Sequence, residues 1–214
     1  MQYVLIAFLM YFCPFTARVD IRVIDGDTFE WNGDIYRLNG IDAPEQGQKC
    51  DDWACGTAAT RALAELLSGA SVSCEIIERD TYGRWVSTCF ADGRDLSAAM
   101  IDKGLAWAFV KFTDVYVPEE LVSRSKAAGV FSGVFLPPWE FRALRWKRAE
   151  AEEQKAPEGC PIKGNISVKS GARIYHMPWS RNYRRTLISP EKGERWFCDE
   201  AEAIAEGWRA PRWD

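Results

Sequence analysis

The sequence has little histidine, no excess of positive charge, and no internal repeat or low-complexity tract. The only histidine among 214 residues is His176, which we interpret as structural. The formal net charge of −4 gives the whole chain no general attraction for a polyanion, so a nucleic acid would have to be held by a local positive groove. The 47% hydrophobic and 13% aromatic content argues against disorder and suffices for one medium domain and a small one.

The apolar run near the N-terminus is too short to cross a bilayer comfortably. It extends from Tyr3 to about Phe15 and matches the hydrophobic part of a secretory signal. No Lys or Arg precedes the run, and cleavage after Ala17 would leave the bulky Phe15 at position −3. We expect a signal peptide or N-terminal anchor over residues 1–17, with a buried first strand as the alternative, and no other membrane segment.

Six cysteines remain when Cys13 is set aside, and this even number in a chain expected to be exported predicts disulfides. Six cysteines allow about 15 pairings, but the local layout favours one of them. One pair flanks a four-residue turn, a second lies on consecutive predicted strands, and the third would join the ends of the C-terminal segment. The favoured pairs are Cys50–Cys55, Cys74–Cys89 and Cys160–Cys198. The expected location is periplasmic or secreted.

Short alternating segments separated by Asn-Gly and Asp-Gly turns predict a mainly β domain. The predicted strands are residues 19–24, 27–31, 34–41, 72–78 and 85–91. The predicted helices are residues 56–67, 96–102 and 118–128. Five short strands with one helix between the third and the fourth is the order of an OB-fold. We therefore predict an α+β, mainly β fold, with a five-stranded OB-fold barrel and packed helices over residues 18–146.

The composition changes after residue 158. Residues 1–158 hold 17 Lys and Arg against 24 Asp and Glu, whereas residues 159–214 hold 10 against 7. We predict a charged linker over residues 147–158 and a small cysteine-containing domain over residues 159–214. Cys160, His176 and Cys198 could bind zinc, but a fourth ligand is missing, so a disulfide-stapled fold is favoured.

The C-terminal segment also carries three arginines among aromatic residues. Arg181, Arg184 and Arg185 could bind phosphate groups of a nucleic acid, whose bases would stack on the neighbouring aromatic rings. The alternative, which we favour, is that the aromatic side chains form the core of the small domain and the arginines its surface.

Three short motifs carry carboxylates and arginines in the β-rich segment. In chain order they are DGDT (residues 25–28), RLNGIDAPE (residues 37–45) and DTYGR (residues 80–84). Hydrolysis of a phosphodiester needs charge neutralisation on the phosphoryl oxygens, a deprotonated water in line, and stabilisation of the developing negative charge. The three motifs together hold residue types suited to each of these tasks.

Carboxylates and arginines divide these tasks between them. Asp27 and Asp42 lie on neighbouring strands, where they would repel each other unless a cation lay between them. Ca²⁺ takes oxygen ligands of this kind, although ligand type alone leaves Mn²⁺ or Mg²⁺ open. Glu45, three residues after Asp42, could orient or deprotonate water. Arg37 and Arg84 suit bidentate phosphate binding and stabilisation of the five-coordinate transition state.

The three motifs, in this order and on this strand plan, resemble the staphylococcal (micrococcal) nuclease family, the thermonucleases, over roughly residues 19–142. The resemblance implies one bound Ca²⁺ ion as cofactor. It implies that Asp27, Asp42 and the backbone carbonyl of Ala43 bind this ion, with Ala43 standing where the best-known member has Thr. Asp25 would be a further carboxylate close behind these ligands.

The same resemblance implies the residues that act on the substrate. Arg37 and Arg84 correspond to the phosphate-binding arginines of the family, and Glu45 corresponds to its general base. Tyr82 falls where the family has a nucleotide-contacting tyrosine, but Thr81 replaces a basic residue before it, so weaker nucleotide affinity is expected. Members of the family cut DNA and RNA at the P–O5′ bond and leave 3′-phosphates.

The sequence therefore predicts an exported, calcium-dependent endonuclease that acts on DNA and RNA, as a monomer without a stable protein partner. One alternative is a catalytically silent OB-fold module that binds nucleic acid or a cell-envelope polysaccharide. Loss of the motif carboxylates would favour that alternative, and all of them are present. A second alternative is a structural envelope protein held by an uncleaved N-terminus.

Overall fold

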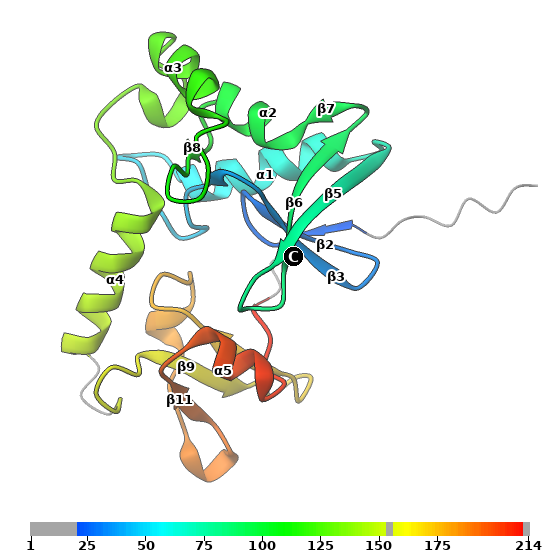
Figure 1. The fold of residues 1–214 in the computed structure, drawn as a ribbon. Coiled ribbons are helices and arrows are strands. Elements are labelled where there is room, and N and C mark those ends of the chain that lie inside the picture. Colours follow the sequence, from blue (N-terminus) through cyan, green and yellow to red (C-terminus); the bar gives the residue numbers. More distant parts are fainter. Residues whose placement is uncertain (1–20, 153–155, 212–214) are drawn as a thin grey trace, which may run out of the picture.

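The computed structural model describes residues 21–152 and 156–211. The signal peptide or anchor expected over residues 1–17 lies outside the described residues. Figure 1 shows a larger unit built around a curled sheet and a smaller C-terminal unit below it, with the long helix α4 (Pro138–Glu152) running from one to the other. No helix in the described part of the chain is long and apolar enough to span a membrane.

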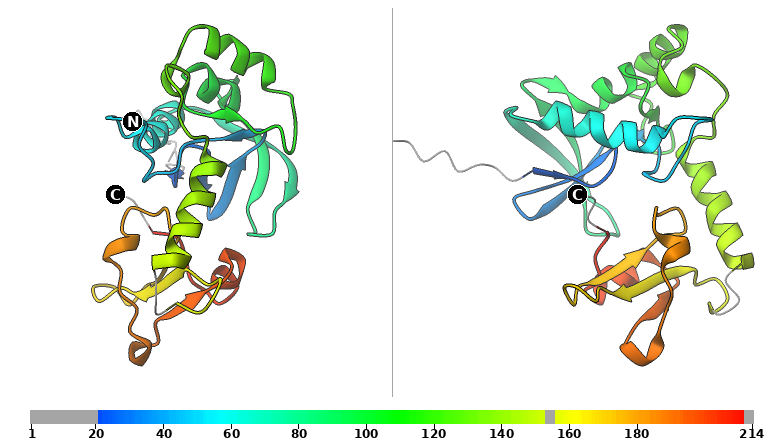
Figure 2. Two further views of the ribbon diagram at one scale, coloured as in Figure 1. Left: turned by 90° about the vertical axis from the view of Figure 1, so that its left-hand side faces the viewer. Right: turned by 180° about the vertical axis from the view of Figure 1, so that it is seen from behind.

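The larger unit is built around one curled sheet, and its helices lie along one side of that sheet (Figures 1 and 2). The strands pair in the order β1 (Ile21–Val23), β2 (Thr28–Trp31), β3 (Asp34–Leu38), β6 (Trp85–Ala91) and β5 (Val72–Arg79), and β7 (Arg94–Asp95) pairs with β6. β3 and β6 run parallel, and the other neighbours are antiparallel. The five predicted strands are present and the α+β, mainly β class is confirmed. Within the described residues, no ladder joins β1 to β5.

Two-residue turns set the register of this sheet. Asn32 and Gly33 adopt φ values of 53° and 88° and join β2 to β3, with Trp31 opposite Asp34. Asp92 and Gly93 do the same between β6 and β7, with φ values of 49° and 78°. Positive φ at both central residues is the turn geometry that matches the twist of a hairpin, and it favours these residue types.

The third strand is shorter than predicted. Residues 34–41 were expected as one strand, but β3 ends at Leu38, and Gly40 turns the chain with a φ of 70°. The separate strand β4 (Ile41–Asp42) then pairs with β8 (Trp107–Ala108), which places Asp42 opposite Trp107. Asn39-Gly40 is a turn signal of the same kind as Asn32-Gly33, and the prediction of a single strand overlooked it. The partner of β4 lies more than sixty residues further along the chain, so its pairing could not be predicted.

Helices cover the core side of the sheet. They are α1 (Cys55–Leu67), α2 (Leu96–Asp102) and α3 (Val117–Ser125), and α3 ends before the predicted residue 128. The main core packs α1 and α2 against the strands through side chains that are almost fully buried, including Phe29, Leu38, Leu63, Leu96 and Met100. Burying such side chains is the main favourable contribution to folding, at roughly 1.5–3 kcal/mol each.

The C-terminal unit has its own sheet and its own core. β9 (Ile162–Ile166) lies between β10 (Arg173–His176) and β11 (Arg195–Phe197), and α5 (Glu200–Ala205) follows. The core of this unit contains Ile162, Tyr175, Met177, Phe197, Ala203 and Trp208. The structure forms the three favoured disulfides, Cys50–Cys55, Cys74–Cys89 and Cys160–Cys198, and these fit a non-cytoplasmic location.

The single histidine is a structural residue in this unit. His176 is buried, and its Nε2 lies 2.9 Å from Asn165 Oδ1. Burial, together with the nearby charge of Lys163, lowers the pKa of His176 to about 4, so the ring is neutral at ordinary pH. Because Cys160 and Cys198 are joined in a disulfide, they are not thiolate ligands for zinc.

Candidate active site

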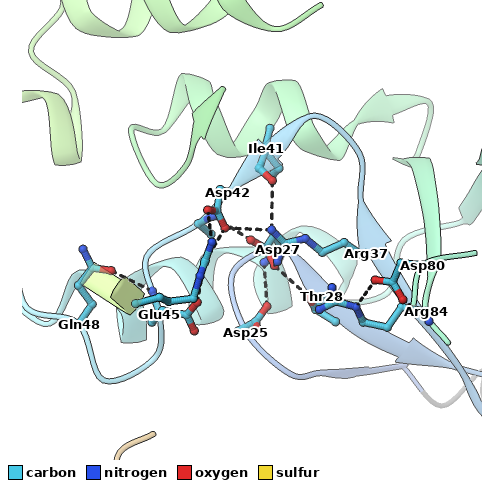
Figure 3. Close-up of polar contacts among 12 residues, drawn as sticks. Asp25, Asp27, Thr28, Arg37, Ile41, Asp42, Glu45, Gln48, Asp80 and Arg84 are labelled. Atoms are coloured by element: carbon cyan, nitrogen blue, oxygen red, sulfur yellow. Dashed lines mark hydrogen bonds and ion pairs between the residues drawn. The ribbon is translucent and has the colours of Figure 1, made fainter. Parts of the chain in front are cut away.

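A buried cluster of charged side chains lies where β2, β3 and β4 meet. Asp27 and Asp42 are 2% and 0% exposed, and Arg37 joins them (Figure 3). Arg37 Nη1 donates to Asp27 Oδ1, and Arg37 Nη2 donates to Asp42 Oδ1 at 2.9 Å. Carboxylates this deeply buried require a paired charge, since an uncompensated charge in the interior costs several kcal/mol.

The DGDT turn holds Asp27 by its backbone and by its side chain. The Asp27 amide donates to Asp25 Oδ1 at 3.2 Å, and the Ala43 amide donates to Asp27 Oδ2 at 2.8 Å. Gly26 allows the turn to lie against α1, because a Cβ at this position would come within 2.6 Å of Ala59 Cβ and 2.7 Å of Ala43 Cβ. The glycine of this motif therefore serves close packing, which the sequence could not reveal.

Arg142 of α4 completes the cluster, and the sequence analysis did not predict it. Arg142 Nη1 donates to Asp42 Oδ1 at 3.0 Å and to Glu45 Oε1 at 2.7 Å, and Arg142 Nη2 donates to Asp42 Oδ2 at 2.8 Å. The three contacts cross 97 and 100 residues of sequence. Nothing in the sequence around Arg142 separates it from the other charged residues of the same segment.

Burial dominates the ionisation of the two carboxylates at the ends of this cluster. It raises the pKa of Asp27 to about 7, against the opposing effect of Arg37. It also raises the pKa of Glu45 to about 7, against the opposing effect of Arg142. Burial alone would lower the pKa of each arginine, but the neighbouring carboxylates raise both and keep the guanidinium groups charged.

The donor set of the cluster fits a hard divalent cation. Asp25, Asp27, Asp42 and Glu45 bring four carboxyl groups together against two guanidinium groups, so the acidic groups outnumber the basic ones. Oxygen donors with excess negative charge are what Ca²⁺ and Mg²⁺ bind. Within residues 21–152 and 156–211, no group of three or more His, Cys, Asp or Glu side chains is arranged around a common metal position. The expected ligand set needs only two carboxylates and one backbone carbonyl.

The loop after Pro44 is anchored by a buried glutamine that the sequence analysis also missed. Gln48 is 1% exposed; its Oε1 accepts from the Glu45 amide at 3.2 Å, and its Nε2 donates to the Leu136 carbonyl at 2.7 Å. The Gly56 amide donates to the Gln48 carbonyl at 3.2 Å. The disulfide between Cys50 and Cys55 closes the same loop, so the backbone around Glu45 is fixed from several sides.

The DTYGR turn between β5 and β6 is organised by its own aspartate. Asp80 Oδ1 accepts from the amides of Tyr82 and Arg84 at 2.9 Å each, and Asp80 Oδ2 accepts from Arg84 Nε at 2.7 Å. The Arg84 guanidinium lies 5.0 Å from the centre of the Tyr82 ring. Figure 3 draws Arg84 together with Asp80, to the right of Asp27 and Asp42 in this view.

The predicted site residues therefore fall into two groups. The structure brings Asp25, Asp27, Arg37, Asp42 and Glu45 into one charged cluster. It places Tyr82 and Arg84 together on the neighbouring turn, where the hydrogen bonds of Arg84 go to Asp80.

Comparison with known proteins identifies the family. Residues 36–128 match the family described as staphylococcal nuclease homologue. A protein of Escherichia coli O157:H7 named uncharacterized endonuclease is 32% identical over 130 residues, which are 57% of this chain and 82% of the relative. The chain belongs to the staphylococcal nuclease family. Enzymes of this family generally depend on a metal ion.

Two further relatives show the breadth of this similarity. Succinoglycan biosynthesis protein ExoI of Rhizobium meliloti (strain 1021) is 40% identical over 119 residues, which are 51% of this chain and 61% of the relative. A probable staphylococcal-like nuclease CAN1 of Oryza sativa subsp. japonica is 31% identical over 111 residues, 50% of this chain and 31% of the relative. The chain thus spans less than two thirds of the length of either protein.

Proposed function

We propose that this protein is an exported, calcium-dependent nuclease that hydrolyses phosphodiester bonds in DNA and RNA. The observation that supports this function most is the buried cluster in which Arg37 and Arg142 tie Asp27, Asp42 and Glu45 together. Such a cluster has no advantage for stability over apolar packing, because removing charges from water costs more than an average ion pair returns. Because the chain belongs to the staphylococcal nuclease family, a role in catalysis would explain why these charges are buried together.

Asp27, Asp42 and the Ala43 carbonyl would hold the cation in this proposal, with Asp25 behind them. When bound, a divalent cation polarises the phosphoryl group and neutralises its charge. Glu45 would take a proton from the attacking water at Oε2, because among the described contacts Arg142 binds only Oε1. A pKa near 7 suits a general base that works at neutral pH.

The two arginines of the motifs would act on the phosphate. Arg37 lies against both aspartates, so a phosphate bound beside them would come within reach of its guanidinium. Asp80 holds Arg84 through Nε, and among the described hydrogen bonds its two Nη atoms have no acceptor, so both can point toward a phosphate. Tyr82, in contact with Arg84, would lie against the nucleotide. The proposed products carry 3′-phosphates.

Digestion of single-stranded DNA and RNA by the disulfide-formed protein, with Ca²⁺ and with a chelator, tests this function. We expect cleavage that the chelator abolishes and that Arg84→Ala lowers about 10- to 100-fold, the worth of a hydrogen bond to a charged group. Arg61→Ala is the matched control, because Arg61 is exposed on α1 and belongs to none of the three motifs. Absence of cleavage with any divalent cation would contradict the proposal.

A second candidate function is binding of a cell-envelope polysaccharide without chemistry. The name of one relative, succinoglycan biosynthesis protein ExoI, favours it, and OB-folds bind oligosaccharides as well as oligonucleotides. Calorimetric titration with succinoglycan would separate the two functions. Binding without nucleic acid cleavage supports the binding module, and cleavage without polysaccharide binding supports the nuclease.

Gly56→Ala should damage the site through the backbone of Glu45. A Cβ at Gly56 would overlap the Glu45 carbonyl oxygen and lie 2.9 Å from the Gln46 carbonyl carbon, so the loop must move. We expect a loss of about 1–3 kcal/mol in the free energy of unfolding and about 100-fold in kcat, since small misplacements of reacting groups are costly.

Chemical denaturation and single-turnover cleavage would measure both effects. Thr57→Ala, on the exposed face of the same helical turn, is the control and should change neither quantity appreciably. In an exposed helix position, Gly→Ala would instead stabilise by roughly 1 kcal/mol. An unchanged or more stable Gly56→Ala protein would show that the loop accommodates the new methyl group.

We further propose that the described chain comprises a nuclease domain ending near residue 146 and a C-terminal domain from residue 159, and that the protein works in the periplasm or outside the cell as a monomer. The separate core of the C-terminal unit and the three disulfides support this organisation and location. Size-exclusion chromatography with light scattering of the oxidised protein would test the oligomeric state.

A further inference from the structure

We propose that α4 and the C-terminal unit belong to the catalytic site: Arg142 positions Asp42 and Glu45, and the C-terminal unit fixes Arg142 by holding α4. This inference rests on the proposed nuclease function. Arg142 lies beyond residues 36–128, the segment that matches the family.

Arg142 is placed to set the orientation of the Glu45 carboxylate. Among the described residues, it is the only one whose side chain bonds to this carboxylate, at 2.7 Å. The Arg142 guanidinium also donates to both oxygens of Asp42, at 2.8 and 3.0 Å, and this bidentate geometry fixes the guanidinium plane. A glutamate side chain has several rotatable bonds, so a fixed partner removes conformations in which it cannot reach the attacking water.

The helix that carries Arg142 is held by the C-terminal unit one turn further on. Arg145 donates to the Pro178 carbonyl through Nη2 at 3.1 Å and Nε at 3.3 Å, and the rings of Trp146 and Trp179 lie 6.4 Å apart. Residues three and four positions apart in a helix are neighbours on one side. The contacts of α4 with the C-terminal unit are therefore continuous with its contacts to the carboxylates.

The same part of the C-terminal unit also contacts the loop that carries Glu45. A Cβ at Gly47 would lie 2.6 Å from the Trp179 carbonyl oxygen, so the two backbones are in close contact. The start of α4 is fixed from the other side, where Trp139 stacks on Phe109 at 5.5 Å. Arg142 thus lies between an anchor in the larger unit and an anchor in the C-terminal unit.

The far side of the C-terminal unit approaches the DTYGR turn. The charges of Glu200 and Asp199, at the start of α5, help to raise the pKa of Tyr82, for which burial is the larger cause. Figures 1 and 2 agree in placing the β5–β6 turn next to α5. The C-terminal unit therefore faces the site at two places, the loop that carries Glu45 and the DTYGR turn.

A double-mutant cycle in the full-length oxidised protein tests the inference. We expect Arg142→Gln and Trp179→Ala each to lower kcat for single-stranded DNA about 10- to 100-fold, the usual cost of losing an outer partner of a metal-ligating carboxylate, with KM little changed. Both substitutions should act by disturbing the orientation of the Glu45 carboxylate. The double variant should therefore be no slower than the slower single variant. Arg142→Lys should recover only part of the loss, because an ammonium cannot bridge two carboxylates as a planar fork does.

Matched variants and a second measurement separate positioning from general damage. Arg148→Gln on the exposed side of α4, where Arg148 pairs only with Glu152 at 3.3 Å among the described contacts, should keep wild-type kcat. If Trp179→Ala fails to fold, Arg145→Met can replace it in the cycle, because methionine keeps the aliphatic part of the side chain. Arg145→Met should lower kcat by the same factor. Calorimetry should show Ca²⁺ binding to Arg142→Gln at least as tight as to the wild type, because a positive charge beside Asp42 is removed.

The outcomes distinguish this inference from the function on which it rests. No cleavage by the unaltered protein would overturn the proposed nuclease function and the inference with it. Full activity of Arg142→Gln, in a protein that does cleave DNA, would overturn the inference alone. Strictly multiplicative losses in the double variant, or loss of Ca²⁺ binding in Arg142→Gln, would also overturn it, because both outcomes indicate independent structural damage.

Discussion

Replacing Glu45 by glutamine is expected to lower kcat about 10²- to 10⁴-fold, the usual contribution of a general base. Glutamine has the same shape and keeps an oxygen that can accept from Arg142, which now bonds to Glu45 Oε1 at 2.7 Å. The fold and the Asp42 contact should therefore persist, and only the proton acceptor is lost. Single-turnover cleavage of a labelled DNA strand measures the effect, and Glu65→Gln on the exposed face of α1 is the control.

The pH dependence of kcat gives this prediction a second readout. Burial raises the pKa of Glu45 to about 7, so the fraction of ionised base falls as the pH drops through that value. We expect kcat of the wild type to fall tenfold per pH unit on the acid side of the Glu45 pKa, and bound Ca²⁺ to move this limb toward lower pH. The limb should be absent from Glu45→Gln. An equally steep limb in the variant would assign the titration to another group.

Local chemistry explains why most of the nuclease fold could be predicted. Asn32-Gly33 and Asp92-Gly93 have the residue types that two-residue hairpin turns demand, and strict alternation between turns defines the strands. The apolar stripe of residues 56–67 predicted α1 almost to its ends. These signals lie within a few residues of the structure that they specify, so no tertiary information was needed.

The missed parts of the site depend on contacts that are distant in sequence. Gln48 reaches Leu136, and Arg142 reaches Glu45 and Asp42, across spans that no periodic pattern covers. The separate pairing of β4 is likewise distant, since Ile41 lies opposite Ala108. Side chains that reach a site from distant segments of the chain look like ordinary polar residues in the sequence. For this reason only the motif residues could be predicted.

Helix α4 shows a related reason for incomplete prediction. The high charge of this segment predicts a linker over residues 147–158, whereas α4 continues to Glu152. Its anchors are single aromatic residues, Trp139 on Phe109 and Trp146 on the C-terminal core. Two well-placed aromatic side chains can stabilise a helix that its overall pattern does not predict.

Arg37→Ala is expected to destabilise the metal-free protein by about 3–5 kcal/mol, the cost of removing one partner from a buried ion pair. Asp27 and Asp42, at 2% and 0% exposed, would lose the guanidinium that lies against both. Arg22→Ala is a matched control in the same sheet: Arg22 pairs with Glu30 near the surface, and such pairs contribute about 0–1 kcal/mol. Urea denaturation in the presence of a chelator measures both variants.

The pH and Ca²⁺ dependence of this loss identify its cause. The pKa of Asp27 is already raised to about 7, and without the lowering effect of Arg37 it would rise further. A carboxyl group whose pKa is higher in the folded state favours folding when protonated, so this stability is present below the unfolded pKa and is lost as pH rises through the folded value. The deficit of Arg37→Ala should therefore be smaller at pH 5 than at pH 8.

At pH 8, saturating Ca²⁺ should restore more stability to the variant than it adds to the wild type, because the cation then replaces the missing positive charge. A deficit independent of both pH and Ca²⁺ would mean that Arg37 stabilises the fold by packing and not by neutralising the two aspartates.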